Sequence, residues 1–419
     1  MDQELRDFLK RQARITAQYT MMGERTPKDK NCYLFIGRRR GGFSGNTKYL
    51  FLHMLRHHPE LECWYLTEER EVYKELCDAR LPVLYFPSSQ AVEMLARTAS
   101  VVVESISFRN QVYYPLLAGA RQIQLWHGVG NKKIGFLLKG IPVLQGHEEG
   151  LLRDHSDYDL IVSTSPFYTE EVFRRSMHAK EFASLGYPRT DALFRPVDKQ
   201  TLVGCDLEAY ARVARAAKRG PVVLFAPTFR DTGMNPITQN VLDLNRFVRF
   251  FADRGAHLVI KPHGRIPIET GHLPGNVTFC RSDSDVYPFF PLVDALITDY
   301  SSIHTEYLLM DRPVIFFWAD FDMYMAVDRG FQFPFEDMCP GPKCRDAESL
   351  FQALEQVLDG TRDEWAEARR ALRDKAFLHR DGKASERIAA YLLQGAFAPG
   401  EEDGHADQDA LSSRANALS

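Results

Sequence analysis

Two histidines stand where a side chain can reach a substrate. His127 follows the apolar run 121–126 and begins a glycine-rich, dibasic segment that ends at Gly135. His263 follows a second apolar run, 257–260, after Lys261 and Pro262. In both places a predicted strand runs into a loop, and open α/β sheets bind ligands beyond the carboxyl ends of their strands. A single histidine at such a position is more often structural than catalytic, but two in matching positions predict one cleft with two walls.

The elements that must position these histidines alternate between short apolar, β-rich runs and helical stretches. This alternation is typical of right-handed βαβ units and a parallel sheet. The pattern stops near Gly186 and restarts at Val222, which predicts a second Rossmann-like unit. The predicted strands are 32–36, 62–66, 83–86, 100–104, 121–126 and 159–163 in the first half, and 222–226, 257–260, 277–280, 295–298 and 314–317 in the second.

A chain of 419 residues is too long for one ordinary core and fits two domains. We therefore predict an α/β fold of the GT-B type, in which two Rossmann-like domains face a central cleft and one of them holds a nucleotide-activated donor. The predicted parts are an amphipathic helix at 1–22, an acceptor domain at 23–195, a donor domain at 196–375, a C-terminal helix at 376–395 and a disordered tail at 396–419.

Composition excludes several classes of protein. The formal net charge of −4 argues against a nucleic-acid binder, which usually carries a strongly basic domain. The seven cysteines are scattered, which predicts no disulfide framework and a reducing compartment. The N-terminus lacks the apolar core of a signal peptide, and no stretch reaches the roughly 20 apolar residues of a membrane span. We therefore expect a cytoplasmic protein.

The N-terminal helix leaves a peripheral membrane contact open. Its apolar side consists of Leu5, Phe8, Ile15, Tyr19 and Met22. Such a face can dock on the protein or lie on an anionic membrane surface, and we favour docking. Two short basic runs stand elsewhere, at 38–40 and 132–133. Such runs are usually solvated surface, and the glycine-rich setting makes the second the stronger candidate for a site.

The second half carries signals for holding phosphate groups. The segment 299–302 reads as a tight Asp-Tyr-Ser-Ser turn between a strand and a helix. Backbone N–H groups and serine hydroxyls there can bind an anion, although a serine in this place often only caps the helix. Converging cations and N–H groups hold a pyrophosphate without a nucleophile or a dedicated metal. The other candidates at strand ends are Thr228, Arg230, Lys261 and Arg329.

Taken in order, these segments resemble those of the CDP-glycerol glycerophosphotransferases, which prime and polymerise teichoic acids and build similar capsule polymers. The ordered set is more specific than any one of its members. It extends over about Tyr33 to Pro342 and comprises 46–49, 126–135, 186–191, 227–231, 261–263, 297–302 and 329–331.

The resemblance implies a GT-B transferase that moves a polyol phosphate from CDP-glycerol, or a related CDP-polyol, to a hydroxyl of a lipid-linked or polysaccharide acceptor and releases CMP. It implies that His127 is the general base, with a pKa near the ordinary value of about 6.5, and that His263 stabilises charge on the phosphoryl oxygens. The residues that it implies for substrate binding are Gly128, Lys132, Thr228, Arg230, Lys261, Asp299, Ser301, Ser302, Glu306 and Arg329.

Two other functions remain open on the sequence. A GT-B glycosyltransferase or epimerase that uses a nucleotide sugar would need the same cleft and phosphate motifs. A non-catalytic scaffold could keep the fold to bind a nucleotide. We expect no obligatory metal or other cofactor, because no carboxylate cluster stands beside the phosphate motifs, and Mg²⁺ would serve only to screen charge.

Overall fold

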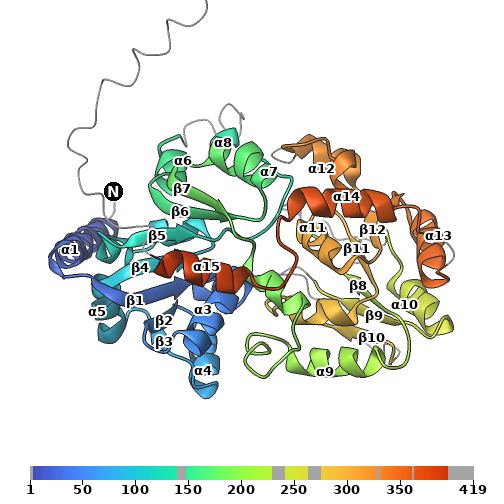
Figure 1. Cartoon of the computed structure of the whole chain (residues 1–419), viewed down its shortest axis with the longest axis horizontal. Helices are drawn as coiled ribbons and strands as arrows, with labels where there is room; N and C mark the ends of the chain where they lie inside the picture. The colour runs from blue at the N-terminus through green and yellow to red at the C-terminus, as the bar shows by residue number, and fades with distance from the viewer. Residues whose placement is uncertain are drawn as a thin grey trace, which may run out of the picture.

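The computed structural model describes residues 3–138, 148–228, 241–262, 275–327, 331–360 and 363–394. These residues form two α/β units, each built on a parallel sheet (Figure 1). Arg230, His263 and Arg329, three of the predicted site residues, lie outside the described ranges, as does the predicted disordered tail.

The first sheet has seven strands in the order β3-β2-β1-β4-β5-β6-β7. Its inner strands are apolar on both faces; Val101, Val102 and Val103, for example, have no exposed surface, because helices cover the sheet on either side. The strands are β1 (Asp29–Ile36), β2 (Glu62–Thr67), β3 (Val83–Tyr85), β4 (Thr98–Val103), β5 (Arg121–Gln124), β6 (Tyr158–Ser163) and β7 (Ala179–Ser184). The helices are α2 (Arg38–Gly41), α3 (Gly45–His57), α4 (Arg70–Asp78), α5 (Ser89–Arg97), α6 (Glu148–His155), α7 (Pro166–Tyr168) and α8 (Arg174–Ser176).

The second sheet has six strands in the order β10-β9-β8-β11-β12-β13. Its central strands are fully buried for the same reason. The strands are β8 (Val222–Phe225), β9 (His257–Ile260), β10 (Val277–Phe279), β11 (Ala295–Thr298), β12 (Val314–Phe317) and β13 (Lys343–Cys344). The helices are α9 (Leu207–Ala216), α10 (Leu244–Asp253), α11 (Ile303–Tyr307), α12 (Phe321–Val327), α13 (Ala347–Leu358) and α14 (Ala366–Ala376).

The chain passes between the two units twice. The first passage runs through the 3-10 turn η6 (Pro188–Leu193), and the second follows α14 and returns to the first unit as α15 (Ala384–Leu393), which packs on α3 and η6 (Figure 1). The Asp191 carboxylate in η6 accepts hydrogen bonds from the backbone N–H of Ala384 at 2.8 Å and of Ser385 at 2.9 Å. Asp191 thereby fastens the two passages to each other.

A buried ion pair joins the two units near these passages. The Lys48 ammonium of α3 lies 2.8 Å from the Asp285 carboxylate, and both side chains are almost fully buried. Lys48 also donates to the Thr201 carbonyl at 2.7 Å, and the Tyr49 hydroxyl donates to Asp285 at 2.8 Å. These partners compensate charges that would otherwise be costly to bury.

The N-terminal helix α1 (Gln3–Arg25) docks on α5 and on the turn η2 (Tyr114–Leu117) through its C-terminal half. Tyr19 and Met22 pack against the core there. Toward its N-terminal end the helix keeps apolar side chains in solvent: Leu5 is 47% exposed, Phe8 55% and Leu9 48%. Within the described ranges, no helix is long and apolar enough to cross a membrane.

Candidate active site

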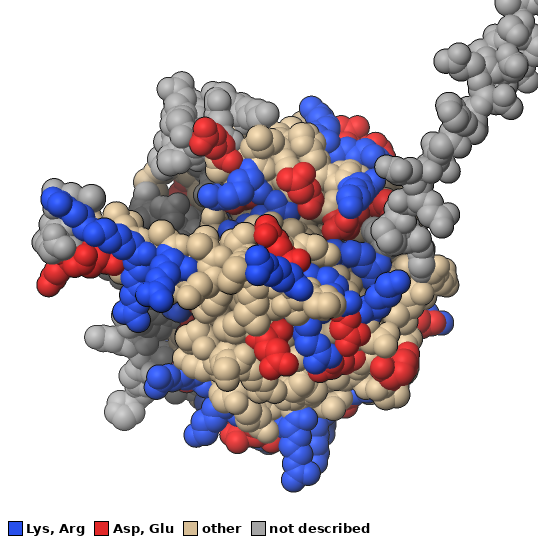
Figure 2. Space-filling view, turned by 90° about the vertical axis from the view of Figure 1, so that its left-hand side faces the viewer, with Lys and Arg blue, Asp and Glu red and all other residues tan. Residues whose placement is uncertain are grey.

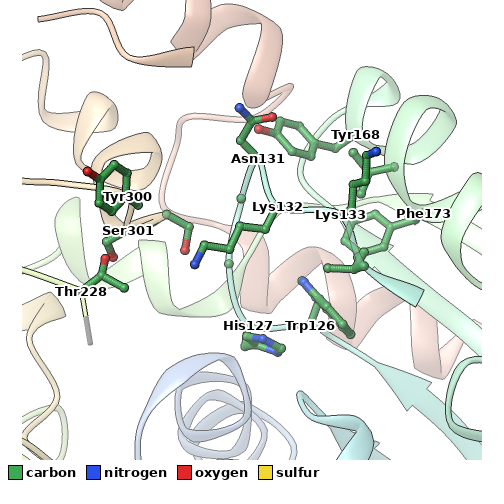
Figure 3. Close-up of a pocket in the computed structure, with 15 residues that line it drawn as sticks. Trp126, His127, Asn131, Lys132, Lys133, Tyr168, Phe173, Thr228, Tyr300 and Ser301 are labelled. Carbon is green, nitrogen blue, oxygen red and sulfur yellow. The ribbon is translucent and has the colours of Figure 1, made fainter. Parts of the chain in front are cut away.

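A cavity of about 350 Å³ lies between the two units, where the loops after β5 and β11 meet (Figure 3). Six of the predicted site residues line it: His127, Gly128, Lys132, Thr228, Ser301 and Ser302. The remaining lining residues are Trp126, Gly130, Asn131, Lys133, Ile134, Tyr168, Val172, Phe173 and Tyr300. The carboxyl ends of the two sheets therefore contribute opposite walls of one polar cavity.

His127 is held by the strand ends of the first sheet. Its Nδ1 lies 2.8 Å from the Glu104 carbonyl oxygen. A carbonyl only accepts, so Nδ1 carries the proton and Nε2 keeps the lone pair that a general base needs. The preceding Trp126 has a left-handed backbone, with φ 56°, and its carbonyl accepts a hydrogen bond from Asn46 Nδ2 at 2.9 Å. Trp126 also stacks on the His127 ring at a centroid distance of 4.4 Å, which fixes the plane of the imidazole.

The surroundings of His127 correct one expectation. Burial first, and then the positive charge of Arg38, lower the pKa of His127 to about 3. The expectation that this pKa stays near its ordinary value is therefore wrong for the empty cleft, because the imidazole is desolvated among cationic neighbours. The neutral ring that proton abstraction requires nevertheless exists across the whole neutral range.

Glu104 is a supporting residue that the sequence analysis did not single out. Its side chain is fully buried below the His127 loop, and Oε2 accepts the Asn46 backbone N–H at 2.5 Å. Oε1 has no hydrogen-bond partner in the described part of the chain. Burial raises the pKa of Glu104 to about 7. The available signal was an acidic residue at the end of an otherwise apolar predicted strand.

The opposite wall presents hydroxyl groups from the second sheet. Asp299 does not line the cavity; its carboxylate accepts from the Thr228 N–H at 2.9 Å and from the Thr228 hydroxyl at 2.5 Å, and so orients that residue. The Ser301 hydroxyl accepts a local bond from the Ile303 N–H at 3.3 Å. The Ser302 side chain makes no capping bond to α11, so the expectation that a serine caps this helix applies to Ser301.

Gly128 lies against the opposite wall of the cavity. A Cβ atom at this position would lie 2.7 Å from Ser302 Oγ and 3.6 Å from a guanidinium nitrogen of Arg189. The first distance is too short for a carbon atom unless Ser302 moves. A side chain at this position would therefore displace the Ser302 hydroxyl of the opposite wall.

Lys132 brings a cation between the walls. Figure 3 shows its side chain extending toward Ser301 and Thr228, whereas Lys133 points away toward Tyr168 and Phe173. The Lys132 loop is clasped to the second unit, because Lys132 pairs with Phe331 in an isolated β-bridge. Beside this bridge, Asn131 accepts from the Phe333 N–H at 2.8 Å and donates to its carbonyl at 3.1 Å.

Two predicted substrate-binding residues lie away from the cavity. The Lys261 ammonium donates to the backbone carbonyls of Arg281 at 3.3 Å and Ser282 at 2.8 Å. The Glu306 carboxylate is fully buried and accepts from Arg189 Nε at 2.9 Å and from the Tyr287 hydroxyl. Glu306 thus joins Arg189 of η6 to the second unit and does not face the cavity.

No group of three or more His, Cys, Asp or Glu side chains that could hold a metal ion occurs among the residues that the structure describes.

Two Rossmann-like units with a polar cleft between their strand ends define a two-domain fold of the GT-B type, and a solved structure confirms this predicted fold. The structure of the wall teichoic acid polymerase TagF superimposes with a TM-score of 0.73 at 21% identity, covering 92% of this chain and 94% of that chain. The chain belongs to the CDP-glycerol:poly(glycerophosphate) glycerophosphotransferase family, whose model matches residues 18–394.

Individual relatives agree with this assignment. The teichoic acid ribitol-phosphate primase of Bacillus spizizenii is 30% identical over 68% of this chain and 73% of its own length. The teichoic acid poly(glycerol phosphate) polymerase of Bacillus subtilis strain 168 is 24% identical over 80% of this chain, which spans only 45% of that polymerase. TagF has also been solved as a histidine-to-asparagine variant soaked with CDPG.

Proposed function

We propose that this protein transfers glycerol phosphate from CDP-glycerol, or the polyol phosphate of a related CDP-polyol, to an acceptor hydroxyl in the synthesis of a teichoic-acid-like or capsule polymer. One observation carries the proposal. A neutral histidine whose Nδ1 is tied to the Glu104 carbonyl lines the same cavity as Thr228, Ser301 and Ser302 of the opposite wall.

In the proposed reaction, the acceptor oxygen attacks the phosphorus atom that carries the polyol. The new O–P bond forms as the bond from that phosphorus to the bridging oxygen breaks, and CMP leaves with the bonding electron pair. His127 Nε2 takes the proton of the attacking hydroxyl. Such a transition state needs mainly positioning and charge stabilisation. Lys132 and the Ser302 hydroxyl line the cavity where the phosphate oxygens would lie.

An anionic substrate would raise the basicity of His127. Burial and the charge of Arg38 depress the pKa of His127 in the absence of ligand. Phosphate groups beside the imidazole would stabilise its protonated form and raise this pKa toward neutrality. The base would thereby gain strength only when the donor is bound.

The acceptor of this reaction is, on our proposal, lipid-linked at the inner face of the cell membrane. Supporting it, α1 keeps the apolar side chains of Leu5, Phe8 and Leu9 exposed beside the basic Lys10, Arg11 and Arg14. Figure 2 shows basic and acidic side chains interspersed over the face that carries α1. A contact through α1 would thus combine apolar insertion with modest attraction to anionic lipid.

Vesicle co-sedimentation tests this contact. Phe8→Asp should release the protein from phosphatidylglycerol vesicles, whereas Leu207→Asp, which alters an equally exposed leucine of α9, should not. Equal binding of both variants and of the native chain would exclude α1 as the contact.

Release of CMP tests the reaction itself. The native chain should release CMP from CDP-glycerol or CDP-ribitol in the presence of an acceptor and should leave UDP-sugars intact. His127→Asn keeps an N–H donor for the Glu104 carbonyl but removes the basic nitrogen, and it should abolish release. A folded native protein that releases no CMP from any CDP-polyol, across a range of acceptors, would refute the proposed function.

A further inference from the structure

A short segment of the second unit, residues 331–335, contacts the first unit beside the cavity and is called the clasp below. On the first unit it meets Asn131, in the loop after β5, and Glu171, in the short helical turn η5 (Thr169–Phe173). The clasp thus adds a further contact between the two units to the two passages of the chain.

Asn131 makes the polar contacts that hold the clasp. Its side-chain oxygen accepts the Phe333 N–H at 2.8 Å, and its side-chain nitrogen donates to the Phe333 carbonyl at 3.1 Å. A carboxamide can bond both backbone groups of one residue because it carries a donor and an acceptor side by side. The Asn131 carbonyl also accepts the Gln332 N–H at 2.7 Å. Asn131 is only 8% exposed, so its burial shields these bonds from competing water.

Aromatic packing holds the other side of the clasp. The Phe333 ring lies on Phe167 of α7 at a centroid distance of 4.9 Å and meets the Tyr168 ring at 6.4 Å in an edge-on arrangement. Gln332 Nε2 donates to the Glu171 carbonyl at 3.0 Å. These contacts fix the clasp on the first unit, so the loop that carries Asn131 has a defined place relative to the second unit.

Lys132, the next residue in this loop, carries a cation of the first unit to the opposite wall (Figure 3). Its backbone pairs with Phe331 in the isolated bridge, and its ammonium lies 5.0 Å from the centroid of the Tyr324 ring in α12. Tyr324 stacks on Tyr300 at 3.6 Å, and Tyr300 immediately precedes Ser301 of the candidate phosphate-binding turn. The ammonium therefore rests against the wall that belongs to the second unit.

We propose that Asn131 is a positioning residue, which sets the Lys132 ammonium beside the pyrophosphate of the donor by fixing the Lys132 backbone to the clasp. The identity of this ligand rests on the proposed function. Both polar atoms of the Asn131 side chain are engaged with Phe333, so Asn131 acts through Lys132 and not on the donor itself.

A lysine needs such a support more than most residues do. Its ammonium is a point charge at the end of a flexible four-carbon stem, so its place in the cavity depends on where its backbone is held. Without the clasp Lys132 would keep its charge, but ordering the loop and the side chain around a ligand would cost conformational entropy at the moment of binding. With the clasp formed, that ordering precedes binding.

Equilibrium binding of CDP and of cytidine to the full chain tests this role without turnover. The two probes share the base and the ribose and differ in the pyrophosphate, so the ratio of their dissociation constants reports the phosphate contacts. Lys132→Ala should reduce the preference for CDP roughly tenfold, and Asn131→Ala should reduce it nearly as much. The double variant should lose little more than Lys132→Ala alone, because both changes remove one interaction. The control Asn110→Ala, which removes an amide bond to Asp154 within the first unit, should keep the native preference.

Hydrogen exchange shows in the same variants whether the clasp has opened. In Asn131→Ala the Phe333 amide loses its acceptor and should exchange faster, while the buried strand β4 stays protected. Faster exchange with an undiminished preference for CDP would make Asn131 purely structural and overturn the inference, as would unchanged exchange or additive losses in the double variant. The expected pattern in a protein that releases no CMP from any CDP-polyol would refute the proposed function and leave the positioning role standing.

Discussion

The substitution Gly128→Ala tests the close approach of the two walls. The new Cβ would lie 2.7 Å from Ser302 Oγ. The same change at Gly130 would meet Ser302 Cβ at 3.6 Å and the Lys132 backbone nitrogen at 4.0 Å, which are ordinary contact distances. Because the Ser302 hydroxyl must turn away, the hydrogen bond that we propose it makes to a donor phosphate would be lost. Such a bond to a charged group contributes about 1.5–3 kcal/mol, which corresponds to a loss of about 10- to 150-fold in kcat/KM.

The assay is release of CMP from CDP-glycerol. We expect the full loss in Gly128→Ala, activity within about twofold of native in Gly130→Ala, and unchanged thermal unfolding in both, since a hydroxyl can rotate without disturbing the core. Ser302→Ala should lose as much as Gly128→Ala, and the double variant should lose little more, because both changes remove one bond. Equal activity of the two glycine variants, or additive losses in the double variant, would refute this account.

Three further predictions follow. Lys48→Met leaves the Asp285 carboxylate buried without its cation, so the free energy of unfolding in urea should fall by about 3–5 kcal/mol. Adding Asp285→Leu should restore most of this loss. A loss below about 1 kcal/mol would contradict a stabilising role for the Lys48–Asp285 ion pair. Because the pKa of His127 is lowered to about 3, nitrogen NMR of the ligand-free protein should show a neutral, Nδ1-protonated ring down to pH 5, and a midpoint near 6.5 would count against it. The pKa of Glu104 is raised from 4.5 to about 7, so the folded state binds this proton more tightly than the unfolded state does. The free energy of unfolding should therefore fall by about 3 kcal/mol as the pH rises from 4.5 to 7. Glu104→Gln should remove this dependence, and native and variant curves that run parallel over this pH range would disprove it.

Most of the sheet structure could be predicted from the sequence because inner parallel strands are apolar on both faces. Every predicted strand has a counterpart in the structure. The two strands that were missed, β7 and β13, lie at the edges of their sheets. Ala179–Ser184 carries Lys180 and Glu181 and is partly exposed throughout, and β13 has only two residues. Neither segment forms an apolar run, so the periodic signal is weak.

The position of the candidate site could be predicted from the sequence, but the contacts among its residues could not. His127, Thr228 and Ser302 meet because the ends of parallel strands share one edge of each sheet. Local sequence could not show that Glu306 would be taken by Arg189, a residue more than a hundred positions earlier in the chain. Nor could it show the depressed pKa of His127, since desolvation depends on what the whole fold packs around the ring.

The two passages of the chain between the domains, fastened together by Asp191, limit how the protein can move. Two connecting segments that are joined side by side permit a hinge motion, because bending about the line through both segments stretches neither of them. Twisting or sliding of one domain on the other would stretch at least one segment. Opening of the cleft, which the proposed exchange of CMP for a new donor would require, should therefore follow a single arc. His127 and Ser302 would return after each cycle to the same separation, so that a transferase adding many units could reassemble one geometry at every step.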